Sequence, residues 1–133
     1  MKRFGIVVVT YNRPRSLSRL LATLAAADYG DDQVDLVISV DRSDIDDRMR
    51  EVAEAFPWAR GAKRVRDFER RQGLRNHVLQ CGDLVAEYDA VVVLEDDLIV
   101  SEGFYRYAKA AIDRFGDDGR VAGVSLYSPL YNL

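Results

Sequence analysis

Short apolar runs alternate with helix-spaced segments along the chain. The runs are rich in Val, Ile and Leu and begin about 30 residues apart, which is the repeat length of strand–helix–strand units. They occupy residues 5–10, 35–40, 63–67, 90–94 and 121–126. Between them, apolar residues recur every three or four positions, as on one face of an α-helix. These helical segments occupy residues 17–24, 45–56, 74–85 and 104–115.

Five strands that alternate with four helices are typical of a parallel sheet with right-handed crossovers and helices on both faces. Residues that begin and end helices agree with this pattern, since Pro14 suits a first helical position and Gly116 suits a helix stop. Ser43 and Ser101 stand where N-caps are expected. We therefore expect an α/β fold, a three-layer α/β/α sandwich with a mainly parallel, Rossmann-like sheet, over residues 1–133 as one domain.

The composition is that of an ordinary folded, globular domain. Of the 133 residues, 48% are hydrophobic and 31% are charged, and the formal net charge is −3. A negative net charge argues against a general affinity for nucleic acid. Residues 58–77, the basic window, differ from the rest because seven basic and two acidic side chains give them a charge of +5. The basic residues are Arg60, Lys63, Arg64, Arg66, Arg70, Arg71 and Arg75.

Cysteine content and hydropathy bear on the compartment. Cys81 is the single cysteine, so the chain forms no internal disulfide and supports no structural zinc site. No apolar stretch approaches the roughly 20 residues that cross a bilayer. The basic N-terminus lacks the apolar length and the cleavage site of a signal peptide. We expect a protein without a transmembrane segment in a reducing compartment, the cytoplasm.

The ends of the predicted strands carry polar and acidic residues. In parallel sheets, ligands bind beyond the carboxyl ends of the strands. The most informative group is Glu95-Asp96-Asp97, directly after the fourth strand. Three consecutive carboxylates repel one another unless a cation or hydrogen-bond donors compensate, and Mg²⁺ or Mn²⁺ is the natural compensation. The alternative is a solvated acidic loop, as expected for Asp31-Asp32, but the position at a strand end favours a functional site.

Several nucleotide-binding classes are disfavoured by the same strand ends. The first strand–helix turn contains neither G-x-G-x-x-G nor G-x-x-x-x-G-K-[ST], which argues against a dinucleotide-binding dehydrogenase and against a P-loop nucleotidase. A phosphoacceptor receiver domain would need acidic residues after the first strand and a lysine after the fifth. Residues 10–12 and 127–129 supply neither.

Four segments together resemble a known family. They are Val7-Val8-Val9-Thr10-Tyr11-Asn12-Arg13-Pro14, Ile38-Ser39-Val40-Asp41, Gly73-Leu74-Arg75-Asn76 and Val92-Val93-Leu94-Glu95-Asp96-Asp97-Leu98. Their order and spacing resemble the nucleotide-sugar-binding half of GT-A glycosyltransferases, in particular family-2-like transferases. The Glu-Asp-Asp-Leu version of the D-x-D motif is most similar to the N-acetylglucosaminyltransferases that initiate complex N-glycans. The likeness spans nearly the whole chain.

The resemblance implies a nucleotide-sugar donor site, with UDP-sugars as the favoured donors. Thr10, Asn12 and Arg13 correspond to the strand end that lies against the nucleotide in such enzymes. Asp41 corresponds to the carboxylate that accepts a hydrogen bond from the base, and Arg75 to an arginine near the base and phosphates.

The resemblance also implies roles for the D-x-D motif. Glu95 takes the first place, near the ribose, and Asp97 takes the last, as a direct ligand of a Mn²⁺ or Mg²⁺ ion that bridges the diphosphate. Asp96 is the middle residue and has no defined role. A metal ion there is chemically reasonable, because the diphosphate leaving group needs charge neutralisation in the transition state.

Structural interpretations stand beside these functional ones. Asn12 and Arg13 are alternatively caps of the first helix. Arg75 is alternatively a solvated charge of a basic helix. His77, the one histidine of the chain, lacks a carboxylate partner in the sequence pattern, so we expect a structural role and give it no catalytic one.

Two functional hypotheses remain. The first is the donor-binding domain of a metal-dependent glycosyltransferase that transfers a sugar to an unknown acceptor. No acidic residue after Asp97 stands at a strand end, so the catalytic base is unassigned and the acceptor-binding half is expected from elsewhere. The second is a non-catalytic protein-interaction module with the same fold. An apolar terminus and an uncovered strand edge also predict a homodimer.

Overall fold

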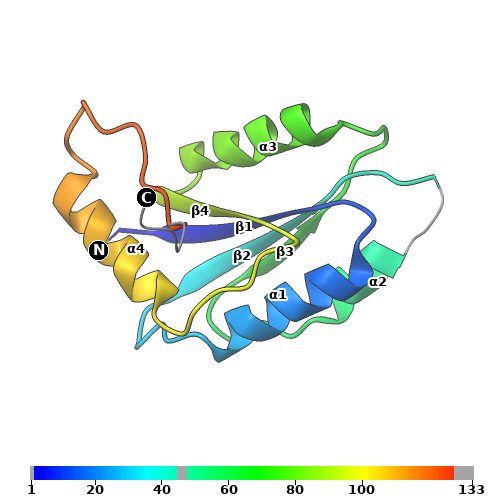
Figure 1. Cartoon of the computed structure of the whole chain (residues 1–133), viewed down its shortest axis with the longest axis horizontal. Helices are drawn as coiled ribbons and strands as arrows, with labels where there is room; N and C mark the ends of the chain where they lie inside the picture. The colour runs from blue at the N-terminus through cyan, green and yellow to red at the C-terminus, as the bar shows by residue number, and fades with distance from the viewer. Residues whose placement is uncertain (1, 45–47, 128–133) are drawn as a thin grey trace, which may run out of the picture.

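The computed structural model describes residues 2–44 and 48–127. Its strands are β1 (Phe4–Thr10), β2 (Val34–Val40), β3 (Lys63–Arg66) and β4 (Ala90–Glu95). Its helices are α1 (Pro14–Ala26), α2 (Arg48–Ala55), α3 (Leu74–Gly82), the short 3-10 helix η1 (Asp83–Ala86) and α4 (Phe104–Phe115). Strands and helices alternate from β1 to α4, as the sequence predicts (Figure 1).

Two of the predicted helix boundaries are confirmed. Pro14 is the first residue of α1, and Gly116 is the C-cap of α4. The N-cap of α4 is Gly103, so the prediction of Ser101 as its N-cap is wrong. The predicted start of the second helix falls at residues 45–47, outside the described residues. No helix in the described part of the chain is long and apolar enough to cross a membrane.

The strands form one parallel sheet in the order β3-β2-β1-β4. β1 pairs with β2 on one side and with β4 on the other, in level register. Val9, near the end of β1, therefore stands beside Ser39 of β2 and Glu95 of β4. As a result, the carboxyl ends of these three strands lie side by side at one end of the sheet, which we call its carboxyl edge.

Helices cover both faces of the sheet (Figure 1). Side chains of a strand point alternately to the two faces. Phe4, Ile6 and Val8 of β1 pack in a core that α1, α2 and α4 complete, whereas Val7 and Val9 pack on the opposite face against α3 and η1. This arrangement confirms the predicted three-layer α/β/α fold with a parallel sheet.

The segment after β4 returns to the amino ends of the strands. Residues 96–103 run back beside α1, where the N–H of Val100 donates to Oγ1 of Thr23 (3.1 Å). α4 follows and is held at that end by an ion pair between Arg106 and Asp28. The return of the chain leaves the carboxyl edge of the sheet open.

An aromatic cluster fills the space at the amino ends of the strands. Tyr105 of α4 packs against Phe4 and Tyr29, with ring centroids 5.5 and 5.2 Å away. Trp58 packs edge-on to Tyr29, and its indole N–H donates to the carbonyl oxygen of Val34 (2.8 Å). The largest aromatic side chains of the core thus lie at the end of the sheet opposite to the carboxyl edge.

Residues 121–127 form no strand, so the prediction of a fifth strand over 121–126 is wrong. All of them are exposed and none has regular secondary structure. The spacing of Val, Ala and Leu gives this segment a strand-like pattern, but a strand also needs a neighbour for its backbone N–H and C=O groups. Within the described ranges, β4 pairs with β1 alone and its outer edge takes no partner. The pattern therefore indicated β-propensity without specifying a pairing.

Candidate functional site

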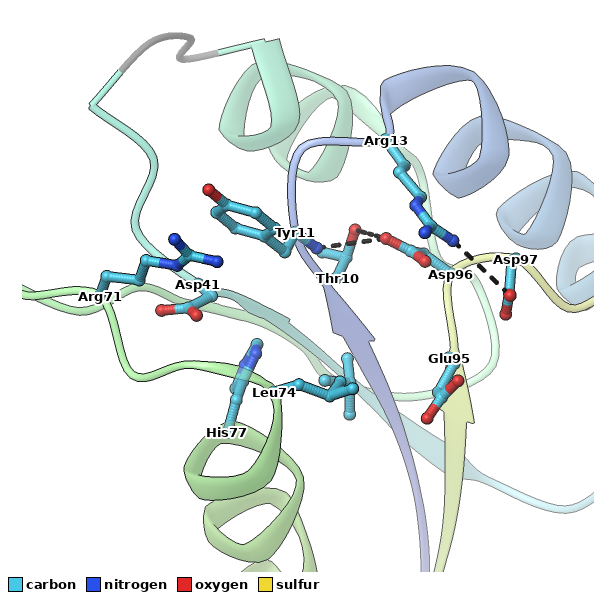
Figure 2. A pocket seen from close by; sticks show the side chains of 11 residues that line it. Thr10, Tyr11, Arg13, Asp41, Arg71, Leu74, His77, Glu95, Asp96 and Asp97 are labelled. Atoms are coloured by element: carbon cyan, nitrogen blue, oxygen red, sulfur yellow. Dashed lines mark hydrogen bonds and ion pairs between the residues drawn. The ribbon is translucent and has the colours of Figure 1, made fainter.

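A cavity of about 250 Å³ lies at the carboxyl edge of the sheet, beside the first turn of α3. Figure 2 shows the side chains around it. The lining residues are Val9, Thr10, Tyr11, Arg13, Asp41, Arg71, Leu74, His77, Glu95, Asp96 and Asp97. Crevices beyond the carboxyl ends of parallel strands are the usual ligand sites of open α/β sheets. The cavity thus lies where the sequence predicts a ligand site, beyond the carboxyl ends of the strands.

Asp96 joins the end of β4 to the end of β1. Its side chain is buried, and its Oδ2 accepts hydrogen bonds from Oγ1 of Thr10 (2.9 Å) and from the N–H of Tyr11 (3.1 Å). The backbone N–H of Asp96 donates to the carbonyl oxygen of Val9 (3.1 Å). The middle carboxylate of the acidic triplet is therefore compensated by donors of the protein itself.

Glu95 and Asp97, on either side of Asp96, are exposed at the cavity. Asp97 forms an ion pair with Arg13 at 3.6 Å, and both side chains are more than half exposed (Figure 2). An exposed pair of this kind contributes little to stability because water screens it. Its members can therefore exchange partners when a ligand arrives.

The exposed carboxylates suit a hard divalent cation only in one coordination mode. Within residues 2–44 and 48–127, no group of three or more His, Cys, Asp or Glu side chains is placed to hold a metal ion. Mg²⁺ and Mn²⁺ are often held by one or two carboxylates, with the remaining positions taken by substrate phosphates and water. Asp97 fits this mode, in which a phosphate-containing ligand completes the site.

Asp41 is buried at the end of β2 and accepts three backbone hydrogen bonds. Oδ1 accepts from the N–H of Arg42 (2.8 Å) and of Gln72 (2.7 Å), and Oδ2 accepts from the N–H of Gly73 (3.0 Å). Gly73 has a φ of 75°, in the left-handed region that favours glycine. The segment before α3 thereby turns its backbone N–H groups toward the end of β2.

Arg71 and Tyr11 form one wall of the cavity. The guanidinium carbon of Arg71 lies 4.5 Å from the centre of the Tyr11 ring, in a cation–π contact (Figure 2). Arg71 is exposed, and no carboxylate within the described ranges forms an ion pair with it. The cavity therefore combines acidic groups at the strand ends with guanidinium groups of Arg13 and Arg71 at its rim.

His77 reaches the cavity from the first turn of α3. Its Nε2 lies 2.7 Å from Oγ of Ser39, which also accepts a hydrogen bond from Nε of Arg66 (3.1 Å). Burial lowers the pKa of His77, although the nearby carboxylates of Asp41 and Asp96 oppose this shift. A neutral, hydrogen-bonded imidazole agrees with the structural role expected from the sequence.

The structure brings together most of the predicted site residues. Thr10, Arg13, Asp41, Glu95, Asp96 and Asp97 all line the cavity. Asn12 and Arg75 are exposed and do not line it. The alternative role of Asn12 as a helix cap is wrong, because the N-cap position of α1 is Arg13 and no side chain caps it.

Five lining residues were not among the predicted site residues, namely Val9, Tyr11, Arg71, Leu74 and His77. Tyr11 lies within the strand-end segment, between two predicted residues, and only its side-chain placement was missing. Arg71 belongs to the basic window, which was a usable signal. Leu74 and His77 lie on the first turn of α3, and no sequence pattern marked them as facing the strand ends.

Replacement of Asp96 should destabilise the fold much more than replacement of Asp97. Asp96→Ala leaves the buried donors of Thr10 and Tyr11 without a partner, which costs about 2–4 kcal/mol. Asp97→Ala removes one exposed ion pair and should change the free energy of unfolding by less than about 0.5 kcal/mol. Urea denaturation of the two variants and the wild type measures both values. Equal losses would contradict the division of roles within the triplet.

His77 should make the protein less stable as the pH falls from 7 to 5. Its folded-state pKa lies below the ordinary value of 6.5, so between these two values the unfolded chain binds more protons. The free energy of unfolding then falls as the pH decreases. Because His77 binds at most one proton, the slope is at most about 1.4 kcal/mol per pH unit. Urea denaturation at several pH values should show this slope in the wild type and a flatter one in His77→Gln. A wild type whose stability rises toward pH 5 would refute the assignment.

Comparison with known proteins identifies the family. The family model "Glycosyl transferase family 2" matches residues 5–129. No curated protein sequence matches the chain. Among solved structures, Staphylococcus aureus TarS 1–349 superposes with a TM-score of 0.69 at 20% identity, over 92% of this chain and 38% of that one. The mannosyltransferase PcManGT of Pyrobaculum calidifontis, in complex with GDP-Man and Mn²⁺, has a TM-score of 0.66 at 22% identity, over 84% of this chain and 32% of that one.

TarS 1–349 is also similar in its complexes with UDP and with UDP-GlcNAc, with TM-scores of 0.67 and 0.63, both at 20% identity and over 92% of this chain. At these identities the likeness establishes the fold. The chain spans less than two fifths of the length of these structures. The family model and the shared architecture together show that the chain belongs to glycosyl transferase family 2 and has the GT-A fold.

Proposed function

We propose that the cavity binds a nucleotide diphosphate sugar and that the chain is the donor-binding domain of a metal-dependent glycosyltransferase. The observation that carries this proposal is the cavity itself. The ends of three parallel strands meet at it, and the end of β4 presents Glu95 and Asp97 next to the guanidinium groups of Arg13 and Arg71. The nucleotides and the Mn²⁺ ion in the complexes of TarS and PcManGT support it.

The residues of the cavity suit a diphosphate with a divalent cation. A bound Mn²⁺ or Mg²⁺ would supply charge neutralisation for the diphosphate leaving group. Asp97 is the proposed metal ligand because it is exposed and, among the residues that the structure describes, is held by the Arg13 ion pair alone. Once Asp97 turns to a cation, Arg13 is free to approach a phosphate oxygen. Glu95, also exposed at the cavity, is the proposed ribose contact.

Asn12 and Arg75 take outer positions in this proposal. Both are exposed beside the cavity, on the first strand–helix turn and on the first turn of α3. A nucleotide that extends past the rim would meet them there, with UDP as the favoured nucleotide. They would add contacts to the nucleotide and would not form the floor of its site.

The acceptor side and the catalytic base are proposed to come from outside these residues. After Asp97, the described acidic residues are Glu102, Asp113, Asp117 and Asp118. The backbone oxygen of Glu102 accepts a hydrogen bond from the N–H of Asp28, and the three aspartates lie on α4 or just after it. Since α4 packs at the amino ends of the strands, none of these carboxylates is positioned to act as a base at the opposite edge.

UDP should bind in the presence of Mn²⁺, and the binding should depend on Asp97. Isothermal titration with UDP, GDP and CDP, each with and without Mn²⁺, compares the wild type with Asp97→Ala. We expect at least a tenfold loss of metal-dependent affinity in Asp97→Ala, because a metal ligand is removed. Asp117→Ala is the matched control, since Asp117 is almost fully exposed and ion-paired to Lys2. The proposal fails if no nucleotide binds with any divalent cation.

We also propose that the open edge of β4 mediates self-association. Among the described residues, β4 pairs only with β1, and Val93 on β4 is 37% exposed. An apolar edge strand without lysine or proline favours pairing with another strand. Exposed apolar residues of 121–127 add to the same tendency.

A lysine on this edge should abolish the self-association. Sedimentation velocity over a range of concentrations should show a dimer for the wild type and a monomer for Val93→Lys. Val85→Lys is the control with the same change, because Val85 is half exposed on η1 and lies on no strand. A wild type that stays monomeric at high concentration would rule out the dimer.

A further inference from the structure

The segment that carries Asp97 is fixed on both sides of that residue. On one side, Asp96 is bonded to the end of β1 through its side chain and its backbone. On the other side, the N–H of Val100 donates to Oγ1 of Thr23 on α1 (3.1 Å). The exposed Asp97 therefore lies on a short stretch of chain between two anchored points, one on the sheet and one on a helix.

The hydroxyl group of Thr23 is oriented as an acceptor by its own helix. It donates its proton to the carbonyl oxygen of Leu20, three residues earlier in α1 (2.8 Å), as threonine side chains in helices commonly do. The lone pairs of Oγ1 are left to accept, and the N–H of Val100 bonds to one of them. The contact joins positions 77 residues apart in the chain, so it fixes tertiary structure and not a local turn.

Val100 is the point at which the segment returns to the core. Its side chain is half-buried and packs against the core cluster, whereas Leu98 and Ile99 are exposed. Residues 98–101 have no regular secondary structure, so neither a strand ladder nor a helix holds their backbone. The next bond along the chain is at Glu102, whose carbonyl oxygen accepts from the N–H of Asp28 (2.9 Å). Without the hydroxyl group of Thr23, the free stretch would extend from Asp97 nearly to that bond.

α1 contacts the segment at the cavity as well. Arg13, the N-cap residue of α1, forms the ion pair with Asp97 at 3.6 Å. Arg13 and Thr23 are ten residues apart, which is roughly 15 Å along a helix, so α1 runs beside the segment from the cavity to Val100. The ion pair is exposed and weak. The hydrogen bond to Thr23 is consequently the firmer of these two contacts.

We propose that Thr23 is a positioning residue for Asp97. By holding Val100 to α1, its hydroxyl group limits the conformations of residues 97–99 and keeps the Asp97 carboxylate at the cavity before a cation arrives. The cation then binds without having to order the segment, which would lower its affinity. Thr23 acts from a distance, since it does not line the cavity. The part of this inference that concerns the cation rests on the proposed function, whereas the part that concerns the segment does not.

Amide hydrogen exchange, measured by NMR without ligand, tests the hold on the segment. Thr23→Val keeps the branched shape of the side chain and removes the acceptor. The amide of Val100 should exchange about tenfold faster than in the wild type, and Thr23→Ser, which keeps a hydroxyl group, should restore its protection. The amide of Asp28, bonded to Glu102, is the internal reference and should not change. Unchanged exchange at Val100, or an equal rise at Asp28, overturns the inference.

Titration with UDP, with and without Mn²⁺, separates positioning from a purely structural role. Thr23→Val should weaken Mn²⁺-dependent binding about fivefold, because the cation then has to order the segment, and should leave binding without the cation unchanged. Thr23→Ser should restore the affinity. Ser18→Ala is the control on the same helix, since Ser18 is exposed, and should behave as the wild type. A hydroxyl group that only stabilises the fold would change both affinities equally or neither, and either result overturns the inference.

Thr23→Ala keeps the inference testable if Thr23→Val does not fold. It removes the same acceptor and places the best helix former at an interior position of α1. The same rise in Val100 exchange and the same loss of Mn²⁺-dependent affinity are expected, and their absence counts against the inference. If the wild type binds no UDP with any divalent cation, the proposed function fails together with the role toward the cation. The exchange of the Val100 amide still decides whether Thr23 holds the segment.

Discussion

The level parallel pairing of β1 with β2 and β4 is the constraint on which the site depends. It brings three strand ends to one edge, so that residues 30 or more positions apart in the sequence face one cavity. A slip of one residue in β4 would turn every side chain of that strand to the other face of the sheet. Asp96 opposes such a slip, since its side chain and its backbone both bond to the end of β1.

Burial divides the carboxylates at this edge into two kinds. Asp41 and Asp96 are buried and each accepts hydrogen bonds from at least one backbone N–H group. Burial of a charge is tolerated where donors of this kind surround it. Glu95 and Asp97 are exposed, and no backbone N–H group of the described residues donates to either carboxylate. The middle residue of the acidic triplet, Asp96, therefore holds the end of β4 to β1, whereas the outer two, Glu95 and Asp97, remain available to a ligand.

The four strands that form, and the helices between them, were predictable because a buried strand or an amphipathic helix leaves its period in the sequence. The pairing of residues 121–126 was not, because a pattern of apolar residues names no partner strand. Much of the cavity was also predictable, since Thr10, Asp41 and Glu95 stand at or next to strand ends. Arg71 and His77 come from a loop and a helix whose approach to that edge depends on tertiary contacts, above all on the hydrogen bonds of Asp41.

The single tryptophan lies far from the cavity, so its fluorescence and that of the tyrosine in the cavity report on different parts of the protein. Trp58 bonds to Val34, the first residue of β2, whereas the cavity lies beyond the last residue of that strand. Seven residues of strand span roughly 20 Å, so a ligand in the cavity does not touch the indole ring. Intrinsic tryptophan fluorescence consequently reports on the integrity of the aromatic cluster at the amino ends of the strands. It follows unfolding and is insensitive to occupancy of the cavity, whereas Tyr11, next to Arg71, lines the cavity and would contact an occupant directly.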